Sequence, residues 1–322
     1  MLMKTVFVLI LFYSNFLFAS GPDLWIDCDT ATGILFRDVD DGYVLAHAIQ
    51  NFPERVAGIS VSFGNVNNPR KQMNIVRKIM ELSKVDIDLF QGATNPLDIR
   101  SPGSQALARF LKNAVEPYSV TILALSRMTT IEGALEIYPE GRTKIKEILF
   151  VGGRATADEP RVGKRKWTLP DSNFWGDEKS FKDILDRGIK ITLFPTDIAV
   201  QFKMTDEDLN SMKSSSHLGH WLAQKSRSWM LVWKVILGEN GFFPFDLMAS
   251  AYISLKSEMT CFQNIPLQIL ALPDYHFGKN GKKIKNRIVV SYDFEISKYK
   301  VDYCYKVSDT FHDKLMTQLL KN

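Results

Sequence analysis

Five aspartates lie between positions 27 and 41, where an apolar strand gives way to an apolar helix. Asp27 and Asp29 are two residues apart, so on an extended strand their side chains point to the same face. Asp40 and Asp41 open a run typical of a buried helix. Helix or loop capping explains one or two of these residues, and we assign Asp38 to that role. Carboxylates this crowded need a cation among them, and Ca2+ or Mg2+ takes such oxygen ligands. The segment therefore predicts a metal site, or a phosphate site bridged by a metal.

Composition favours an ordinary globular enzyme over a nucleic-acid-binding protein. The chain has 322 residues, of which 45% are hydrophobic and 24% charged, enough for one large α/β domain with its own core. The net charge is only +4 and the basic residues are mostly scattered. The densest basic run, 281–287, contains no aromatic residue, so we interpret it as a solvated hairpin loop and expect no nucleic-acid partner.

The N-terminus is typical of a targeting segment. Met1–Lys4 is short and basic, Thr5–Phe18 is almost entirely apolar, and the small residues Ala19–Gly21 follow. This pattern predicts a secretory signal peptide over residues 1–19 and a single catalytic domain over residues 20–322. The mature protein is then expected in the periplasm or secreted, without a stable membrane span. Leu17 fits the cleavage pattern poorly, which leaves an uncleaved anchor as the alternative.

Three cysteines match no metal-binding spacing. Cys28 lies between Asp27 and Asp29, so it faces the opposite side of the strand and is expected to be a small buried residue. The sequence leaves open whether Cys261 and Cys304 form a disulfide.

Apolar strands alternate with helical patterns along most of the chain. The expected strands are Leu24–Asp29, Val56–Val61, Asp86–Phe90, Ser119–Leu125, Ile148–Val151 and Ile189–Phe194. The expected helices are Asp41–Asn51, Arg70–Leu82, Gln105–Ala114, Thr130–Ile137, Glu178–Asp186, Ser214–Leu237 and Asp309–Leu320. This alternation predicts an α/β fold with a mainly parallel, doubly wound sheet flanked by helices. Thr260–Leu270 and Arg287–Ser297 predict an antiparallel ribbon near the C-terminus.

Polar residues or glycines follow nearly every expected parallel strand, which places them at one edge of the sheet. Ligands bind outside the carboxyl ends of strands in such folds, so this edge is the expected site. The residues are Asp27, Asp29, Gly64-Asn65, Ser126–Thr130, Gly152-Gly153 and Thr196-Asp197. The polar segment Arg154–Pro170 predicts a long loop that acts as a lid. Trp221, Trp229 and Trp233 are assigned to core packing.

With these residues in hand, the chain resembles the inosine–uridine-preferring nucleoside hydrolase family. The similarity begins with the aspartate pattern DxDxxxDD, although the loop before Asp40-Asp41 is longer here. Six further elements match in order: Phe63–Val66, Gln91–Ala93, Leu125–Thr130, Phe150–Gly153, Asp171–Asp177 and Phe245–Ala249. In two of them the match is looser, because only one threonine fits in Leu125–Thr130 and Asp171 replaces a glutamate.

The resemblance implies a Ca2+-dependent N-ribohydrolase that splits nucleosides into base and ribose. The implied calcium ligands are Asp29, Asp41, the Thr129 carbonyl and Asp246. Asp29 is also the implied catalytic base, which takes a proton from the attacking water, and Asp27 orients the neighbours of the metal. The family commonly forms homodimers or homotetramers, which is the implied assembly.

The same resemblance assigns the substrate contacts. Asp40 binds the 2′-hydroxyl, Asn65 and Asn173 hold the sugar, and Asp171 reaches toward the 5′-hydroxyl. Phe245 stands where some relatives have a histidine and purine-preferring relatives have a stacking aromatic, so the resemblance implies a preference for purines. His217 or His220 is the candidate replacement for the missing acid, and His276 and His312 are expected at the periphery. Arg165 replaces a sugar-binding asparagine, which implies an anionic or nucleotide-like ligand.

Two alternatives remain open at this stage. One is a relative that binds ribosides without cleaving them, because the leaving-group histidine is missing. The other is a Mg2+ phosphatase of the haloacid-dehalogenase type, whose DxDx[TV] pattern Asp27–Thr30 resembles, with the first aspartate as nucleophile.

Overall fold

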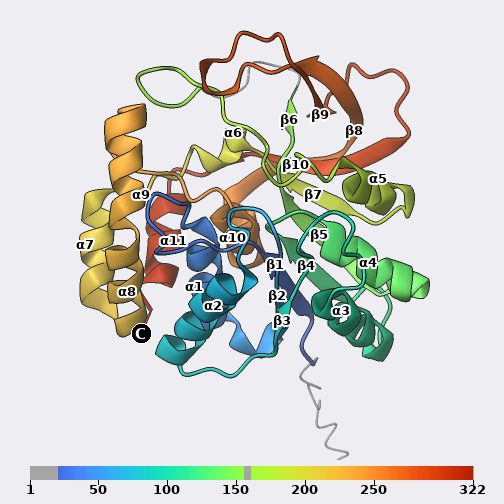
Figure 1. Ribbon diagram of the computed structural model, residues 1–322, viewed down its shortest axis with the longest axis horizontal. Helices are drawn as coiled ribbons and strands as arrows, with labels where there is room; N and C mark the ends of the chain where they lie inside the picture. The colour runs from blue at the N-terminus through green and yellow to red at the C-terminus, as the bar shows by residue number, and fades with distance from the viewer. Residues whose placement is uncertain (1–20, 156–160, 322) are drawn as a thin grey trace, which may run out of the picture.

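The computed structural model describes residues 21–155 and 161–321, so the expected signal segment 1–19 lies outside the described residues and its cleavage stays a prediction. Ten strands of the described chain form one sheet (Figure 1). Six neighbouring strands run parallel, in the order β3 (Leu89–Gln91), β2 (Val56–Val61), β1 (Leu24–Cys28), β4 (Val120–Ala124), β5 (Ile145–Val151) and β7 (Ile191–Phe194). The sheet continues through β10 (Tyr299–Val307), β8 (Met259–Pro273), β9 (Ile284–Val290) and β6 (Arg154–Ala155).

Helices cover both faces of the parallel part, as the alternation of strands and helices predicts. The structure contains α1 (Asp40–Asn51), α2 (Pro69–Ser83), α3 (Pro102–Asn113), α4 (Thr129–Ile137), α5 (Glu178–Asp186), α6 (Thr196–Ala199), α7 (Asp206–Ser215), α8 (His217–Lys225), α9 (Arg227–Val232), the π-helical turn η3 (Trp233–Leu237), α10 (Leu247–Leu255), the turn η5 (His276–Gly278) and α11 (Phe311–Leu319). One hydrophobic core lies under α1, α2, α10 and α11, and a second lies under α3, α4 and α5. The predicted doubly wound α/β fold is therefore confirmed.

Local sequence explains where several helices begin. Asn68 accepts a hydrogen bond from the Lys71 N–H, and Pro69 then occupies the first position of α2, where its missing N–H is no loss. Ser101 and Pro102 do the same for α3. The expected helix over 214–237 is instead divided into α8, α9 and η3, with breaks around Ser216 and Ser226. None of the described helices is long and apolar enough to cross a membrane.

The antiparallel ribbon is confirmed, but one of its strands was not expected. β8 pairs antiparallel with β9, whereas residues 291–297 form no strand. β10, which the sequence analysis missed, lies parallel to β7 and antiparallel to β8, so it joins the two parts of the sheet. The sequence of β10 shows no regular alternation of polar and apolar residues, because both faces of the strand are buried in its middle.

A disulfide joins Cys261 to Cys304, which face each other across β8 and β10. The pairing that the sequence left open is thereby resolved, and closing a loop of 43 residues restricts the unfolded chain. Cys28 is free and fully buried, as expected for a core residue on the face opposite Asp27 and Asp29.

Candidate functional site

The site lies where the strand order of the sheet reverses. β1 is central, with β2 on one side and β4 on the other, and all three run parallel. The connections from β1 and β4 go to opposite faces, which opens a crevice at their carboxyl ends. Asp27 and Asp29 stand at this end of β1, and Thr129 begins α4 just after β4. The topology thus brings together aspartates and a threonine that are far apart in the sequence.

Asp27 ties the ends of three strands together. Its Oδ1 accepts hydrogen bonds from the Ser60 hydroxyl and the Ser62 hydroxyl (2.8 Å), and its Oδ2 accepts one from Ser126 (2.7 Å). Burial raises the pKa of this carboxyl to about 6, and the three hydroxyls oppose that rise. Because both oxygens are engaged by serines and the side chain is fully buried, Asp27 supports the site from below. The same geometry argues against a nucleophilic role in a phosphatase.

Asp29 is held by Asn65 through two hydrogen bonds. The Asn65 backbone N–H donates to one oxygen (2.8 Å) and its side-chain amide to the other (2.9 Å). Burial raises the pKa of Asp29 to about 7, with the Asn65 N–H acting in the opposite direction. This approach requires glycine at position 64, because a Cβ there would lie 1.6 Å from Asp29 Oδ2. Gly64 and Asn65 together therefore fix the position of the Asp29 carboxylate.

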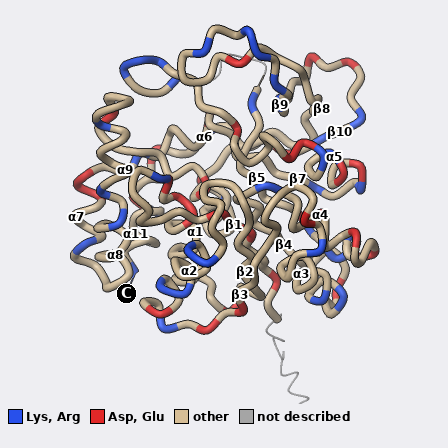
Figure 2. Tube along the Cα trace, viewed as in Figure 1, with Lys and Arg blue, Asp and Glu red and all other residues tan. Residues whose placement is uncertain are grey.

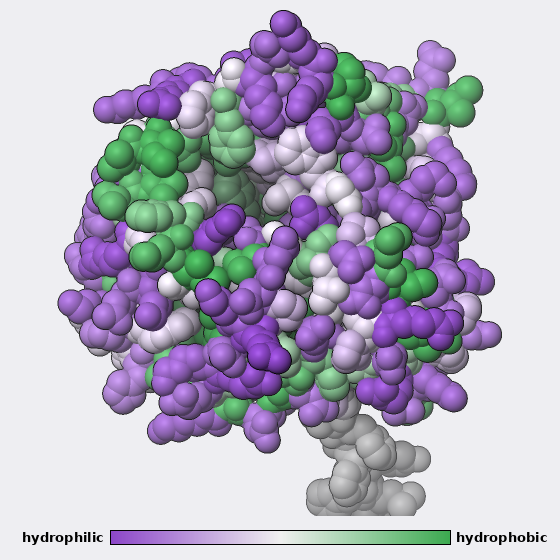
Figure 3. All heavy atoms as spheres, viewed as in Figure 1, coloured by the Kyte–Doolittle hydropathy of each residue, from purple (hydrophilic) through white to green (hydrophobic). Residues whose placement is uncertain are grey.

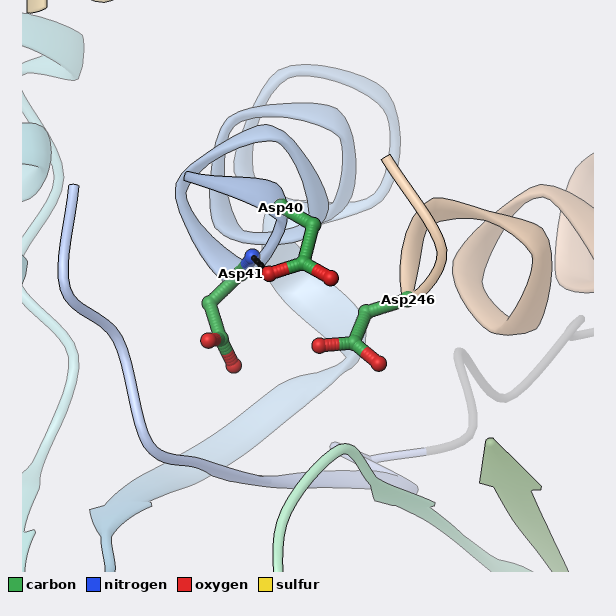
Figure 4. A group of neighbouring side chains, drawn as sticks. All are labelled: Asp40, Asp41 and Asp246. Atoms are coloured by element: carbon green, nitrogen blue, oxygen red, sulfur yellow. Dashed lines mark hydrogen bonds between the residues drawn. The ribbon is translucent and has the colours of Figure 1, made fainter. Parts of the chain in front are cut away.

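Asp40, Asp41 and Asp246 converge at the heart of the site (Figure 4). Asp40 and Asp41 come from the start of α1 and Asp246 immediately precedes α10, and one carboxylate oxygen from each lies within 4.8 Å of the others. Each of the three side chains is buried. Burial, and then the neighbouring carboxylates, raise the pKa values of Asp41 and Asp246 well above the ordinary range. Three buried carboxylates in such contact must share protons or a cation.

One atom of this cluster lacks a partner. Asp41 Oδ1 accepts the Asp29 N–H at 3.3 Å, whereas Asp41 Oδ2 is buried and has no hydrogen-bond partner among the described residues. A buried carboxylate oxygen left unsatisfied is costly, and a cation would compensate it. An all-oxygen donor set of aspartates suits a hard cation such as Ca2+. The residues present therefore fit a divalent metal.

Above the carboxylates the structure has a cavity of about 370 Å³. Asp38, Asp40 and Asp246 line its floor, and the expected sugar contacts Asn65, Asp171, Asn173 and Phe245 line its walls. Asp29 and Asp41 are not lining residues, and both are buried. Asp38 Oδ1 also accepts the Val39 N–H at 2.7 Å, which is the loop-ordering role expected for it. One cavity is therefore lined by six of the predicted site residues: Asp40, Asn65, Asp171, Asn173, Phe245 and Asp246.

Asp171 and Asn173 are held in place by the backbone. The Gly153 N–H donates to Asp171 Oδ2 (2.7 Å) and the Phe174 N–H to Asp171 Oδ1 (3.1 Å), while the Asn173 amide donates to the Val151 carbonyl (3.2 Å). Thr129, whose N–H donates to Asp177 Oδ2 (3.0 Å), is fixed in a similar way. Each polar group at this edge is thus oriented by a neighbouring strand or loop.

An aromatic wall faces the acidic floor, and sequence analysis missed most of it. Besides Phe245 it comprises Trp167, Phe194, Trp229, Trp233 and Phe277. Trp233 is also buried against the rings of Phe243 and Phe245, at 5.2 and 6.2 Å, so the core-packing assignment was incomplete. Trp221 packs on the core as predicted. The four-residue spacing of Trp229 and Trp233 puts both on one helical face, and this spacing was the available signal.

The candidate replacements for a leaving-group acid lie elsewhere. None of the five histidines, all of them in the described part of the chain, lines the cavity. His217 and His220 line a separate groove beside the C-terminal ends of α1 and α2, so the idea that one borders the pocket is wrong. His276 is buried rather than peripheral, because it packs beside Asp274 and Arg287.

Arg165 does not occupy a sugar-binding position. Its side chain is exposed, and its guanidinium lies 4.9 Å from the centre of the Trp167 ring. Trp167, Leu169 and Pro170, from the same segment, line the cavity instead. The mouth is visible as a hollow in the upper part of Figure 3, beside a hydrophobic cluster over α9.

Comparisons with known proteins agree with this geometry. The family model described as inosine-uridine preferring nucleoside hydrolase matches residues 24–295. The chain is 24% identical to uridine nucleosidase 1 of Arabidopsis thaliana over 197 residues, which is 53% of this chain and 57% of that protein. Among solved structures, a plant nucleoside hydrolase, PpNRh1, has a TM-score of 0.71 at 17% identity, covering 92% of this chain and 97% of that one. The purine-preferring ribonucleoside hydrolase from Gardnerella vaginalis has a TM-score of 0.70 at 17% identity, with 92% and 98% covered.

Proposed function

The chain belongs to the inosine-uridine preferring nucleoside hydrolase family, and from this premise we propose that it hydrolyses the N-glycosidic bond of ribonucleosides to free base and ribose. Family membership indicates an enzyme that acts on N-glycosidic bonds. The observation that carries the proposal is the convergence of Asp40, Asp41 and Asp246 beneath a cavity of nucleoside size. The amides of Asn65 and Asn173 supply hydrogen-bonding groups for a sugar beside this floor.

We assign the metal as Ca2+, held by Asp29, Asp41, Asp246 and the Thr129 carbonyl. The unpartnered Asp41 Oδ2 and the closeness of Asp41 to Asp246 support the first part of this assignment, whereas Asp29 and the Thr129 carbonyl enter it from the family resemblance. Bound there, the ion supplies Lewis acidity toward water and compensates the charge of the carboxylates.

The side chains of the site divide the remaining work. Asp29 takes a proton from the attacking water, and the two hydrogen bonds from Asn65 aim its oxygens. Asp40 accepts the 2′-hydroxyl, Asn65 and Asn173 hold the ribose, and Asp171 lies toward the 5′-hydroxyl. The nearby carboxylates stabilise the positive charge that develops on the sugar in an oxocarbenium-like transition state. Asp27, through its three serines, keeps the strand ends in register beneath Asp29.

The aromatic wall supports a preference for purines. Phe245 and Trp233 present neighbouring rings to the cavity, and stacking on such a surface contributes on the order of 1–3 kcal/mol per base. The larger ring system of a purine gains more from this contact than a pyrimidine does. The named relatives include both a uridine nucleosidase and a purine-preferring hydrolase, so they do not indicate which base is preferred. The proposed preference for purines depends on the aromatic residues that line the cavity of this chain.

A second candidate is a protein that binds ribosides without cleaving them. The cavity lining formed by the described residues favours it, because it contains no histidine that could protonate the leaving base. The carboxylates and amides of the floor serve binding equally well.

A reducing-sugar assay separates these candidates. The purified protein is incubated with inosine, adenosine, guanosine, uridine and nucleoside monophosphates, in Ca2+ or in EDTA, alongside the Asp29→Ala variant. Calcium-dependent ribose release, fastest with purines and absent from Asp29→Ala, is the expected result. Saturable nucleoside binding without ribose release would replace the hydrolase with the binding protein.

We also propose export to the periplasm or medium, with a homodimer or homotetramer as the assembly. The Cys261–Cys304 disulfide supports export, because disulfides persist mainly in oxidising compartments. Mass spectrometry of the mature N-terminus and non-reducing electrophoresis of the native protein test it: residues 1–19 should be absent and the disulfide intact.

A further inference from the structure

The net charge of the chain is concentrated in one hairpin. The connection between β8 and β9, with the start of β9, covers residues 273–287 and carries five cationic side chains against one acid. This excess equals the formal net charge of the whole protein, +4, so the remainder is neutral. In Figure 2 the connection forms the basic stretch at the top of the molecule.

Three of these cations converge on Trp175. The Lys285 Nζ lies 4.5 Å and the Lys279 Nζ 5.1 Å from the ring centre, and the Arg287 Cζ lies at 5.3 Å. Each contact gains a cation–π attraction, but together they hold like charges close to one another. The fold therefore supplies the aromatic residue that the basic run 281–287 lacks in the sequence.

A groove of about 670 Å³ lies between Trp175 and the hairpin. Lys279, Lys282, Lys283 and Lys285 line it, together with Trp175 and Asn280. The volume lies within the range of small-molecule sites. The groove is separate from the substrate cavity, because the loop 171–175 presents Asn173 to the cavity and Trp175 to the groove.

Among the described residues, the groove has too little negative charge to balance its lysines. Asp274 is the one acid of this part of the chain that lines it, is only 1% exposed, and already contacts Lys279 (2.9 Å), His276 (2.8 Å) and Arg287 (3.5 Å). Within residues 21–155 and 161–321, no acidic group lies within 4 Å of the ammonium groups of Lys282, Lys283 and Lys285. The buried Trp175 Nε1 also lacks an acceptor among those residues.

We propose that this groove binds a small ligand bearing several phosphate groups, independently of the hydrolase site. Ammonium groups supply donors for phosphate oxygens, and several lysines match a multiply charged anion better than a single carboxylate. A polyphosphate and the phosphates of a nucleotide share this chemistry. The single ring in the groove offers no series of stacking platforms for a nucleic-acid strand.

The test is calorimetric titration with inorganic tripolyphosphate in EDTA, which removes any effect of calcium chelation. The variant Lys282→Gln/Lys283→Gln/Lys285→Gln is compared with a control of equal charge, Lys71→Gln/Lys112→Gln/Lys300→Gln, whose lysines are exposed elsewhere. We expect 1:1 binding to the wild type, at least about tenfold weaker binding to the hairpin variant, and binding within about twofold of wild type for the control. Thermal melting checks that all three proteins are folded.

Two further arms sharpen the result. ATP binding tighter than tripolyphosphate would assign a nucleotide, and equal affinity would assign the phosphates alone; both support the groove. Trp175→Leu should weaken binding by a few-fold, because it removes the ring that Lys279 and Lys285 contact. No binding to the wild type, equal weakening in the control variant, or tight binding of a single-stranded oligonucleotide that tripolyphosphate does not displace would overturn the proposal.

Discussion

The carboxylates at the base of the cavity and the lysines of the hairpin groove are two clusters of like charge that differ in burial. Asp40, Asp41 and Asp246 are each no more than 5% exposed, whereas the Lys279 side chain is 46% exposed. Repulsion between like charges is strong in a buried site and is screened at the surface. The acids must therefore be neutralised within the molecule, by protons or a cation, while water and salt relieve the lysines. The buried carboxylates therefore indicate a binding site for a cation more strongly than the exposed lysines indicate one for an anion.

The largest expected effect comes from removing one of the buried carboxylates of the site. Asp29→Ala should lower kcat by at least ~10³-fold, because it removes both the proton acceptor and a calcium ligand. Asp23→Ala is the matched control just before the same strand, where the carboxylate pairs with Arg55 at 2.8 Å near the surface. Steady-state kinetics of ribose release should show the control within about twofold of wild type. Comparable losses in both variants would mean that the effect is structural.

The pH dependence of stability should distinguish the buried acids from the exposed lysines. The pKa values of Asp27 and Asp29 are raised from 3.8 to about 6 and about 7, so between these limits the folded state binds more protons than the unfolded state. Stability of the metal-free protein should therefore fall as pH rises from 5 to 8, by ~4 kcal/mol from these two groups.

Denaturant unfolding in EDTA measures this slope, and saturating Ca2+ should reverse it. Asp41→Asn removes one of the competing charges and should flatten it, while the hairpin lysine variant should keep the wild-type slope. Stability that rises with pH in the metal-free protein would show that the carboxylates are compensated in another way.

The aromatic wall should contribute less than the floor. Phe245→Leu keeps the volume apolar but removes the stacking surface, at a cost on the order of 1–3 kcal/mol in binding the base. We expect kcat/KM for inosine to fall by about 5- to 150-fold and that for uridine to fall less. An equal loss for both nucleosides would remove the basis for a purine preference.

The smallest expected effect belongs to the groove. The triple lysine-to-glutamine variant of the hairpin should change the free energy of unfolding by less than ~0.5 kcal/mol, because exposed charges contribute little. Ribose release should also stay unchanged, since these lysines do not line the cavity. Chemical denaturation and the sugar assay check both statements. A loss of several kcal/mol would mean that the hairpin is part of the folded core rather than a surface site.

The parallel half of the fold was predictable because its signals are local. β1, β2 and β4 are short apolar runs between turns, and polar residues follow each of them, so the edge that carries the site could be identified from the sequence. β10 was missed because its pairing with β7 and β8 depends on strands distant in the chain. A half-buried strand without regular alternation carries no local signature.

Within the site, acidic residues were easier to predict than their surroundings. Crowded aspartates are chemically conspicuous, whereas the serines around Asp27 come from two separate segments, at the ends of β2 and β4, and each alone is unremarkable. Trp175 meets Lys285 only in the folded chain, so the basic run seemed to lack an aromatic residue. Arg165 was expected to contact the ligand because of its position relative to Asp171 in the family pattern. It lies outside the cavity because the turn between Val162 and Trp167 directs it outward.

The most direct test of the central claim is a calcium titration of the metal-free protein that follows binding and ribose release together. We expect one Ca2+ per chain, an increase in unfolding free energy of about 2.7 kcal/mol at one hundred times the Kd, and half-maximal activity at that Kd. Asp246→Asn should weaken both the binding and the activity at least about a hundredfold. Activity that is unaffected by EDTA, or calcium affinity that is equal in Asp246→Asn and wild type, would contradict the assignment of this carboxylate cluster.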